Sequence, residues 1–322
     1  MSLLVVGSVA LDSVETPFGA RENVLGGSAT YFAAAASLLT KVSVVGVVGD
    51  DFPLGDLRFL QDRGVSLDGL EKVAGRTFRW KGKYGFDLNA AQTLDTQLNV
   101  FEKFEPKLSP QARKAERIFL GNIDPELQTR VLDQAENPRL VCADTMNFWI
   151  TGKRAALLKL LPRVDVLMVN DGEVRQLAGE ANVIKAARAA MRMGAKSVVV
   201  KRGEYGALLV TERFASEREE PEGRTIGGES FYSPAYPVAE VVDPTGAGDS
   251  FAGGFLGLLD RLNTNDPAAL RQATVMGSTI ASFTVEQFSL DRLRDLDLGQ
   301  VRRRFEAFRA LVHFEDLPVH LG

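Results

Sequence analysis

Histidine and cysteine are scarce in this chain of 322 residues, which contains two histidines and one cysteine. Both histidines, His313 and His320, lie near the C-terminal end, so a Ser-His-Asp triad, a histidine-rich zinc site or a histidine base would have to be built from the tail. The single cysteine excludes an internal disulfide, and Cys142 stands in an apolar, strand-like run where we expect a small core residue. Any acid–base chemistry is therefore expected to fall to a carboxylate.

Long apolar runs and an excess of basic residues are also missing. No run is long enough to span a bilayer, and no basic, apolar leader precedes the apolar stretch Leu3–Val6. A formal net charge of -4 gives no electrostatic case for binding nucleic acid or an anionic membrane. We therefore expect a cytoplasmic protein whose partners are small molecules, with no nucleic-acid or membrane partner.

The chain does contain a regular alternation of strand and helix patterns, and its length suits one large α/β domain or two modest ones. The nearly continuous β-branched run Val42–Val48 predicts a strand buried on both faces. Together the patterns predict a doubly wound, mostly parallel sheet. The charged stretch Ser216–Arg224 is expected to be a solvated hairpin or loop. Further strands are expected at Leu3–Gly7, Arg117–Leu120, Leu140–Ala143, Asp165–Asn170, Ser197–Lys201 and Gly206–Val210. Helices are expected at Tyr31–Leu39, Leu54–Gly64, Pro125–Ala135, Arg154–Leu161, Glu173–Leu177 and Val183–Met193.

The stretch Thr77–Phe104 breaks this rhythm, because it contains no convincing helix. Phe78 and Trp80 alternate with basic residues, and Tyr84 and Phe86 continue the pattern. Such alternation predicts an antiparallel β excursion. On pattern alone it is either an extra edge hairpin or a cover over a ligand site.

The most informative segment is residues 242–254, Val-Asp-Pro-Thr-Gly-Ala-Gly-Asp-Ser-Phe-Ala-Gly-Gly. A glycine-rich turn that opens a helix presents free backbone N–H groups and the positive end of the helix dipole to an anion. Asp249, directly after the turn, fits a general base that takes a proton from an attacking hydroxyl. The amides of Gly246, Ala247 and Gly248 would then hold the developing charge. The alternative is a capped helix behind a tight turn.

Residue for residue, this segment resembles the C-terminal signature of the ribokinase-like (PfkB) family of carbohydrate and nucleoside kinases. The resemblance extends over essentially the whole chain and implies one ribokinase-like α/β domain over residues 1–322. The implied fold is a three-layer sandwich with a mostly parallel central sheet and a small β-sheet lid. Residues 77–104, with part of 12–25, would form this lid over the substrate site, where exclusion of water suppresses ATP hydrolysis. The implied reaction is the ATP- and Mg²⁺-dependent phosphorylation of a primary hydroxyl of a small sugar or nucleoside.

The resemblance also assigns residues to Mg²⁺ and the nucleotide. Asn170 and Glu173 match the family's Asn-x-x-Glu motif, which organises Mg²⁺ and phosphate largely through water; unaided, they form an N-cap with a first-turn acid. Lys201 and Gly203 belong to a Lys-x-Gly-x-x-Gly turn like the one that lines the family's nucleotide site. Lys201 or its neighbour Arg202 either reaches the ATP phosphates or ends a strand in solvent.

The remaining nucleotide contacts come from the anion turn itself. Thr245, Gly246 and Gly248 complete the nucleotide-binding set. A monovalent cation such as K⁺ beside the loop Asp243–Thr245 occurs in parts of the family, and the sequence leaves its presence here open.

The acceptor site is implied to lie near the N-terminus. Asp12 matches an aspartate that accepts hydrogen bonds from substrate hydroxyls, or else it forms a turn. Gly26 and Gly27 match a pair of glycines that lets the backbone approach the substrate. Tyr31 stands where many members have asparagine, so it either contacts the substrate through its ring or phenol or packs in the core. This substitution weakens the case for ribose itself as the acceptor.

Several alternatives remain open. The acceptor is a sugar, a nucleoside, a cyclitol or, if Arg79, Lys81 and Lys83 bind a second phosphate, a sugar phosphate. The aromatic residues of the lid, Trp80, Tyr84, Phe86 and Phe104, cover either a base or a sugar, or form the lid core. Lid-to-lid dimers are common in the family, so a homodimer is compatible with the resemblance.

Two other function classes share features with this sequence. A nicotinamide-dependent dehydrogenase is disfavoured, since the segment Gly7–Ala10 lacks the later glycines of a Gly-x-Gly-x-x-Gly turn. A non-catalytic ligand-binding homologue on the same fold is harder to separate from a kinase by sequence. Asp144, at a strand end, is expected to contribute from behind the site, and Asp50 and Asp51 are expected to have a structural role in a turn.

Overall fold

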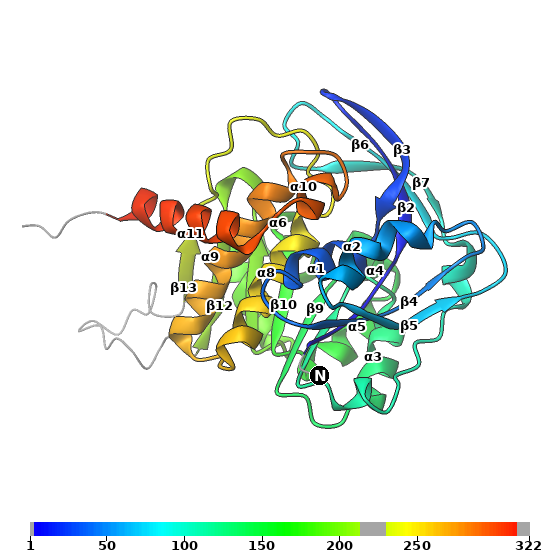
Figure 1. Ribbon diagram of the computed structural model, residues 1–322. Helices are drawn as coiled ribbons and strands as arrows, with labels where there is room; N and C mark the ends of the chain where they lie inside the picture. Colours follow the sequence, from blue (N-terminus) through cyan, green and yellow to red (C-terminus); the bar gives the residue numbers. More distant parts are fainter. Residues whose placement is uncertain (1–2, 213–229, 314–322) are drawn as a thin grey trace, which may run out of the picture.

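The computed structural model describes residues 3–212 and 230–313, and its centre is a nine-stranded sheet between two layers of helices (Figure 1). The strand order is β13-β12-β11-β10-β9-β8-β1-β4-β5. All neighbouring pairs from β11 to β5 are parallel, whereas β12 is antiparallel to both of its neighbours. The strands are β1 (Leu3–Val6), β4 (Val42–Val48), β5 (Ser66–Lys72), β8 (Arg117–Leu120), β9 (Leu140–Asp144), β10 (Val166–Asn170), β11 (Ser197–Lys201), β12 (Ala207–Thr211) and β13 (Ser230–Ser233).

The helices divide between the two faces of this sheet, each of which carries its own hydrophobic core. One core is shared by α1 (Ser28–Ala36), α2 (Arg58–Asp62), α8 (Ala247–Leu262), α9 (Pro267–Thr284), α10 (Asp291–Arg294) and α11 (Leu298–Val312). The other core is shared by α3 (Pro125–Gln134), α4 (Asn147–Gly152), α5 (Arg154–Leu160), α6 (Asp171–Ala178) and α7 (Val183–Arg192). Short 3-10 turns lie at Leu54–Leu57, Asn99–Lys103, Ala112–Lys114, Leu161–Arg163 and Gly203–Tyr205.

The apolar runs of the central strands are explained by these two cores. Along β1, Leu3 and Val5 point into the first core, while Leu4 and Val6 point into the second. Because successive side chains of a strand alternate between faces, a strand covered on both sides needs an unbroken apolar run. The prediction for Val42–Val48 is confirmed, since every residue of β4 is buried. Cys142 is likewise a buried core residue.

The predicted α/β class and mostly parallel sheet are confirmed, but several elements differ from the sequence patterns. The helix predicted at Leu54–Gly64 is a 3-10 turn followed by the short helix α2. The strands β5 and β13 were missed, because both lie at edges of the sheet and are only partly buried. The predicted loop at Ser216–Arg224 lies outside the described residues.

A second sheet of four strands stands at one side of the molecule, at the upper right of Figure 1, in the order β3-β2-β6-β7. Its strands are β2 (Ala10–Thr16), β3 (Gly19–Gly26), β6 (Arg79–Tyr84) and β7 (Ala91–Gln97). The antiparallel β excursion predicted within Thr77–Phe104 is confirmed as the β6–β7 hairpin. A parallel pairing of β2 with β6, which the sequence did not indicate, joins it to the antiparallel β2–β3 hairpin. Phe104, expected in this sheet, packs instead in the second core of the main body.

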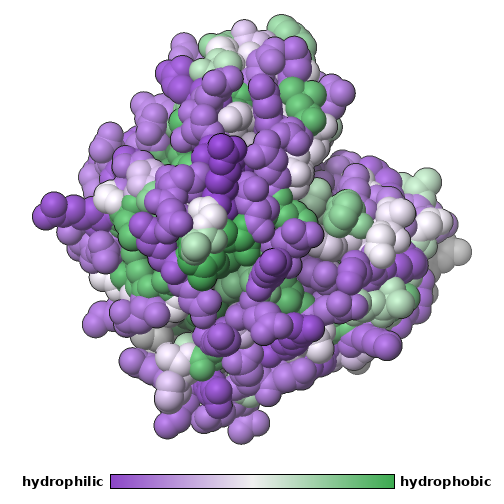
Figure 2. Space-filling model, turned by 90° about the vertical axis from the view of Figure 1, so that its right-hand side faces the viewer, coloured by the Kyte–Doolittle hydropathy of each residue, from purple (hydrophilic) through white to green (hydrophobic). Residues whose placement is uncertain are grey.

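The surface that includes the side of β4 and β5 is shown in Figure 2. Hydrophilic residues cover most of it, and hydrophobic residues gather in one central area.

Phe86, at the tip of the β6–β7 hairpin, is 91% exposed, so this predicted aromatic contributes neither to the core nor to the inner face of the small sheet.

One buried ion pair connects β8 of the central sheet with α8. Arg117 of β8 and Asp260 of α8 lie 3.1 Å apart, with their side chains 2% and 3% exposed. The Thr40 hydroxyl also donates to Asp260, so the carboxylate is held from two directions. The sequence patterns did not indicate this pair.

Removing one partner of this pair is expected to be costly. Asp260→Ala should lower the free energy of unfolding by about 3–5 kcal/mol, because it leaves the guanidinium of Arg117 buried without its carboxylate. Chemical denaturation measures the change. The control is Glu306→Ala in the exposed Arg302–Glu306 pair, which should cost less than about 1 kcal/mol. Equal losses in the two variants would show that the buried pair has no special role.

Candidate functional site

The candidate site lies at the carboxyl edge of the parallel sheet, where β9, β10 and β11 end at Asp144, Asn170 and Lys201. Adjacent parallel strands in register bring these three polar side chains to one edge, which is where open α/β sheets bind ligands. The N-terminus of α8, which begins at Ala247, faces the same edge. The structure therefore brings together residues that are far apart in the sequence.

The anion turn before α8 (residues 245–248) has the geometry expected from its glycines. Gly246 is the N-cap of α8 and adopts φ 74°, a left-handed conformation that favours glycine. A Cβ atom on Gly246 would also lie 2.3 Å from the ring of Tyr31, so a side chain here is excluded twice. The Thr245 amide donates to Asp243 at 2.9 Å, which fixes the entry into the turn.

Four charged side chains surround the first turn of α8. The ammonium of Lys201 lies 2.6 Å from Asp144 and only 2.9 Å from where a Cβ atom on Gly248 would be. Burial acts to lower the pKa of Lys201, but Asp144, Glu173 and Asp249 outweigh it and raise that pKa. Lys201 therefore remains a cation at the anion turn. Arg202, the other basic candidate, stacks over Tyr205 at 5.8 Å from the ring centroid.

Two carboxyl groups of this cluster, Asp249 and Glu173, have pKa values near neutrality. Burial raises the pKa of Asp249 to about 7, the charge of Asp144 acts in the same direction, and Lys201 opposes it. Burial likewise raises the pKa of Glu173 to about 7, with Asp144 again adding and Lys201 opposing. A carboxyl whose pKa lies near 7 holds and releases a proton readily at physiological pH, as a general base must.

Asn170 and Glu173 form a capping box at the start of α6. The Asn170 side chain accepts from the Glu173 amide, and the Glu173 carboxylate accepts from the Asn170 amide, each at 2.7 Å. Both interpretations from the sequence are therefore compatible with the geometry, since the capping box faces the charge cluster through Glu173.

The donor set suits a magnesium ion held mainly through water. Within residues 3–212 and 230–313, no group of three or more His, Cys, Asp or Glu side chains is placed to hold a metal ion directly. Mg²⁺ keeps several waters and needs only one or two carboxylates beside substrate phosphates. Asp144, Glu173 and Asp249 together outnumber the single cation Lys201, and a divalent cation would balance this charge.

Asp12, on β2, is the predicted acceptor-binding carboxylate, and it is 5% exposed. Burial raises its pKa to about 7, the Gly27 amide opposes this, and the charges of Asp243 and Asp249 add to it. The Gly27 amide donates to it at 3.3 Å, and a Cβ atom on Gly26 would lie 1.9 Å from its oxygen. The two glycines thus make room for this carboxylate and hold it in place.

The small sheet presents two further side chains, Trp80 and Tyr84, to the same region. Trp80 of β6 pairs in register with Asp12 of β2, so the two side chains share one face. Tyr84, four residues after Trp80 in β6, lies on the same face. The Thr245 hydroxyl lies 3.4 Å from the phenol oxygen of Tyr84. The indole of Trp80 covers Gly82 and donates to Thr93 of β7 at 3.2 Å. Tyr84 was named only as a covering aromatic, and its contact with the anion turn was missed.

Tyr31 and Gly203 lie at the borders of the site. Tyr31 is 2% exposed, and its ring packs against the anion turn at Gly246. Gly203 has φ 54° in the turn after β11, and a Cβ atom there would lie 2.3 Å from Asn89 of the β6–β7 loop. Asn89 also donates to Glu204 at 3.2 Å, so this loop of the small sheet lies on the predicted nucleotide turn.

The basic residues considered for a second phosphate point elsewhere. Arg79 is bound to Asp51 at 2.7 Å, and Lys83 is bound to Glu15 at 2.5 Å. In β6 these residues alternate with Trp80 and therefore lie on the opposite face. The argument for a sugar phosphate, which depended on them, loses its support.

No helix among the described residues combines the length and apolar character that crossing a membrane requires.

Comparison with known proteins agrees with the geometry of the site. The model of the pfkB carbohydrate kinase family matches residues 3–293. The cytidine kinase of Thermococcus kodakarensis is 31% identical over 266 residues, which cover 80% of this chain and 87% of that protein. The aminoimidazole riboside kinase of Salmonella typhimurium is 27% identical over 290 residues, with 84% of each chain covered.

Among solved structures, the nucleoside kinase of Methanocaldococcus jannaschii, an archaeal member of the ribokinase family, superimposes with a TM-score of 0.72. The alignment covers 95% of this chain and 99% of that one at 21% identity, and it therefore supports the fold. With the anion turn, Asp249 and the matched family model in agreement, this chain belongs to the pfkB family of carbohydrate kinases and is a phosphotransferase.

Proposed function

We propose that this protein is an ATP- and Mg²⁺-dependent nucleoside kinase that phosphorylates the primary hydroxyl of a ribonucleoside. The observation that carries the proposal is the position of Asp249. Its carboxylate lies directly behind the anion turn, and its charge contributes to the raised pKa of Asp12 on the small sheet. One carboxylate is thus available for proton transfer and the other for holding the acceptor.

Asp12 and Trp80 support a nucleoside as the acceptor. A carboxylate accepts hydrogen bonds from two hydroxyls, so Asp12 suits the 2′ and 3′ hydroxyls of a ribose. Trp80 shares its face of the small sheet, and nucleobases stack on aromatic side chains of this kind. The names of the two relatives above refer to cytidine and to aminoimidazole riboside. Each of these compounds consists of a ribose joined to a flat heterocycle.

The transfer step follows from the charges at the turn. Asp249 takes the proton of the acceptor hydroxyl while the oxygen of that hydroxyl bonds to the γ-phosphorus of ATP. The bond between this phosphorus and the β–γ bridging oxygen breaks, which releases ADP. The amides of Gly246, Ala247 and Gly248, with the ammonium of Lys201, stabilise the charge on the transferring group. When bound, Mg²⁺ neutralises phosphate charge. Asn170 and Glu173 would hold it through water.

The small sheet excludes water from this reaction. Tyr84 contacts Thr245 at the anion turn, and Asn89 contacts the nucleotide turn beside Gly203. These two contacts support a lid role for the sheet, and exclusion of water favours transfer to the acceptor over hydrolysis.

The proposal is tested by ADP release from Mg-ATP with a panel of acceptors: cytidine, uridine, adenosine, inosine, ribose, inositol and fructose 6-phosphate. Ribonucleosides are expected to give the signal, and 2′-deoxycytidine should be at least about tenfold poorer in kcat/KM than cytidine, because Asp12 loses a hydroxyl partner. A signal confined to free sugars or cyclitols would refute the nucleoside assignment. ATP binding without turnover on any acceptor would instead indicate a binding protein on a kinase fold.

The general base is tested by Asp249→Asn. Turnover should fall by about two to four orders of magnitude, the usual contribution of a general base. The folded state should not be weakened at pH 8, because burial disfavours the charged form that the substitution removes. Asp62→Asn, an exposed carboxylate of α2, is the matched control and should keep full turnover. Turnover of Asp249→Asn close to that of the control would exclude Asp249 as the base.

The raised pKa of Asp249 also predicts a pH profile. Since only the ionised carboxylate accepts a proton, kcat/KM should decline as the pH falls through about 7. The free energy of unfolding depends on pH in the opposite direction to the activity. The folded state retains protons on Asp12, Glu173 and Asp249 that the unfolded chain has already lost, so the free energy of unfolding should decrease as the pH rises from about 4 to about 7. Activity assays between pH 5 and pH 9 and urea denaturation between pH 4 and pH 9 measure the two trends. A kcat/KM that stays flat down to pH 5 would contradict this assignment.

A further inference from the structure

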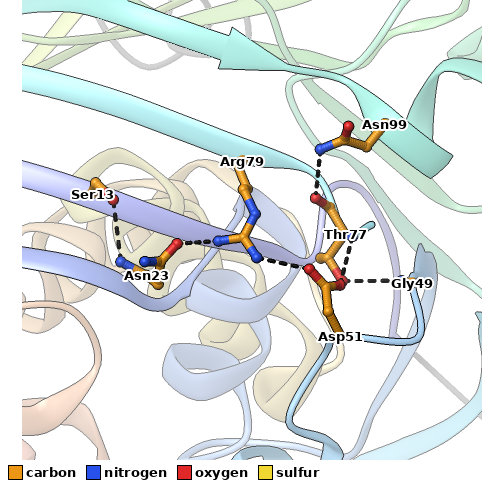
Figure 3. Close-up of polar contacts among 7 residues, drawn as sticks. All are labelled: Ser13, Asn23, Gly49, Asp51, Thr77, Arg79 and Asn99. Atoms are coloured by element: carbon orange, nitrogen blue, oxygen red, sulfur yellow. Dashed lines mark hydrogen bonds and ion pairs between the residues drawn. The ribbon is translucent and has the colours of Figure 1, made fainter. Parts of the chain in front are cut away.

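A polar cluster at the base of the lid takes no part in the proposed chemistry (Figure 3). From its geometry we infer that Asp51 is a positioning residue that fixes the small sheet in its closed orientation over the acceptor site. Its effect on turnover depends on the proposed function, whereas its effect on the orientation of the lid does not.

Asp51 follows β4 in the main body and binds the start of the lid strand with both oxygens. One oxygen accepts from the amide and the hydroxyl of Thr77, at 2.8 and 2.7 Å. The other binds Arg79, the first residue of β6, at 2.7 Å. Burial acts to raise the pKa of Asp51, but the bonds from Thr77 and Arg79 outweigh it and lower that pKa. The carboxylate is therefore ionised and committed to the lid.

Arg79 extends this attachment to the second hairpin of the lid. Its guanidinium binds Asp51 with one terminal nitrogen and the side-chain oxygen of Asn23 with the other (Figure 3). Asn23 lies in β3 with φ 51°, and its backbone N–H donates to the hydroxyl of Ser13 in β2 at 3.1 Å. A single arginine thus joins the main body to both hairpins of the small sheet.

Thr77 makes the attachment rigid. It is fully buried, and its hydroxyl accepts from the Gly49 amide at 3.0 Å while donating to Asp51. Its carbonyl accepts from the side chain of Asn99 at 3.0 Å, on the segment where the chain returns to the main body. The incoming and outgoing connections of the β6–β7 hairpin therefore meet at this residue.

β6 then acts as a lever between two points on the main body. Arg79 and Tyr84 are its first and last residues, so roughly 17 Å of strand separates them. Arg79 is held by Asp51 at one end, and Tyr84 contacts Thr245 of the anion turn at the other. A small rotation at Asp51 therefore displaces Tyr84 from the anion turn and reorients Trp80, which adjoins Arg79.

The kinetic test compares Arg79→Ala and Asp51→Asn with Lys83→Ala. The first two variants break the Asp51–Arg79 ion pair, so KM for the acceptor should rise about tenfold, as expected for losing a charged hydrogen bond. KM for ATP should change much less, since the nucleotide turn stays intact, and ATP hydrolysis without acceptor should increase because water enters the site. Lys83→Ala breaks an exposed lid pair that does not reach the main body, and it should leave all three quantities unchanged.

Asp51→Asn and Arg79→Lys separate the two parts of the attachment. Asparagine can still accept from Thr77 but loses its charge toward Arg79. Lysine keeps that charge but cannot bind Asp51 and Asn23 together as the guanidinium does. Arg79→Lys should therefore rescue part of the acceptor KM lost in Arg79→Ala. A purely structural role would instead lower the melting temperature and reduce kcat together with both kcat/KM values.

A readout without substrate keeps this test independent of the proposed function. The chain has two tryptophans, and in a Trp149→Phe background the emission comes from Trp80 on the lid. Arg79→Ala in this background should increase the Stern–Volmer constant for acrylamide quenching, and Lys83→Ala should not. Unchanged quenching and unchanged acceptor KM in Arg79→Ala would overturn the inference. Increased quenching in a protein that phosphorylates no acceptor would support the inference while refuting the proposed function.

Discussion

The collection of buried charge at the N-terminus of α8 is the constraint on which the rest of the structure depends. Asp144, Glu173, Asp249 and Lys201 lie in a region from which water is partly removed. Such charges cost free energy to bury, and attraction within the cluster offsets only part of that cost. The two hydrophobic cores on either face of the sheet provide the remaining stability. The cost has a functional return, because the same desolvation that opposes ionisation places the pKa of Asp249 near 7.

The lid and the anion turn depend on each other in this arrangement. Tyr31 packs below Gly246, and Tyr84 reaches Thr245 from the small sheet, so the turn lies between two aromatic side chains. Asp12 lies on the small sheet itself, and the charge of Asp249 adds to the effect of burial in raising the pKa of Asp12. In the proposed function, the orientation of the small sheet therefore affects the electrostatics of the site as well as the access of water. Asp51, which follows β4 in the main body, is linked to the small sheet through Arg79 at the start of β6.

Much of the fold and the site could be predicted from the sequence because the signals were local. The apolar run Val42–Val48 predicted its own burial, and the segment 242–254 predicted both the turn and the helix that follows. Interactions between distant segments could not be predicted in this way. The pairing of β2 with β6, the contact of Tyr84 with Thr245 and the Arg117–Asp260 pair each join residues more than 60 positions apart. Arg79 illustrates the limit, since its charge suggested phosphate binding until its partners were known.

The central claim is that Asp249 is a buried carboxylate that titrates near neutrality. Carbon-13 NMR of the aspartate carboxyl groups tests it directly, with the Asp249 signal assigned by its loss in Asp249→Asn. The account predicts a titration near pH 7 in the ligand-free protein and a still higher midpoint in Lys201→Met, since the opposing cation is then gone. A midpoint close to the ordinary value of 3.8, unaffected by Lys201→Met, would contradict the account.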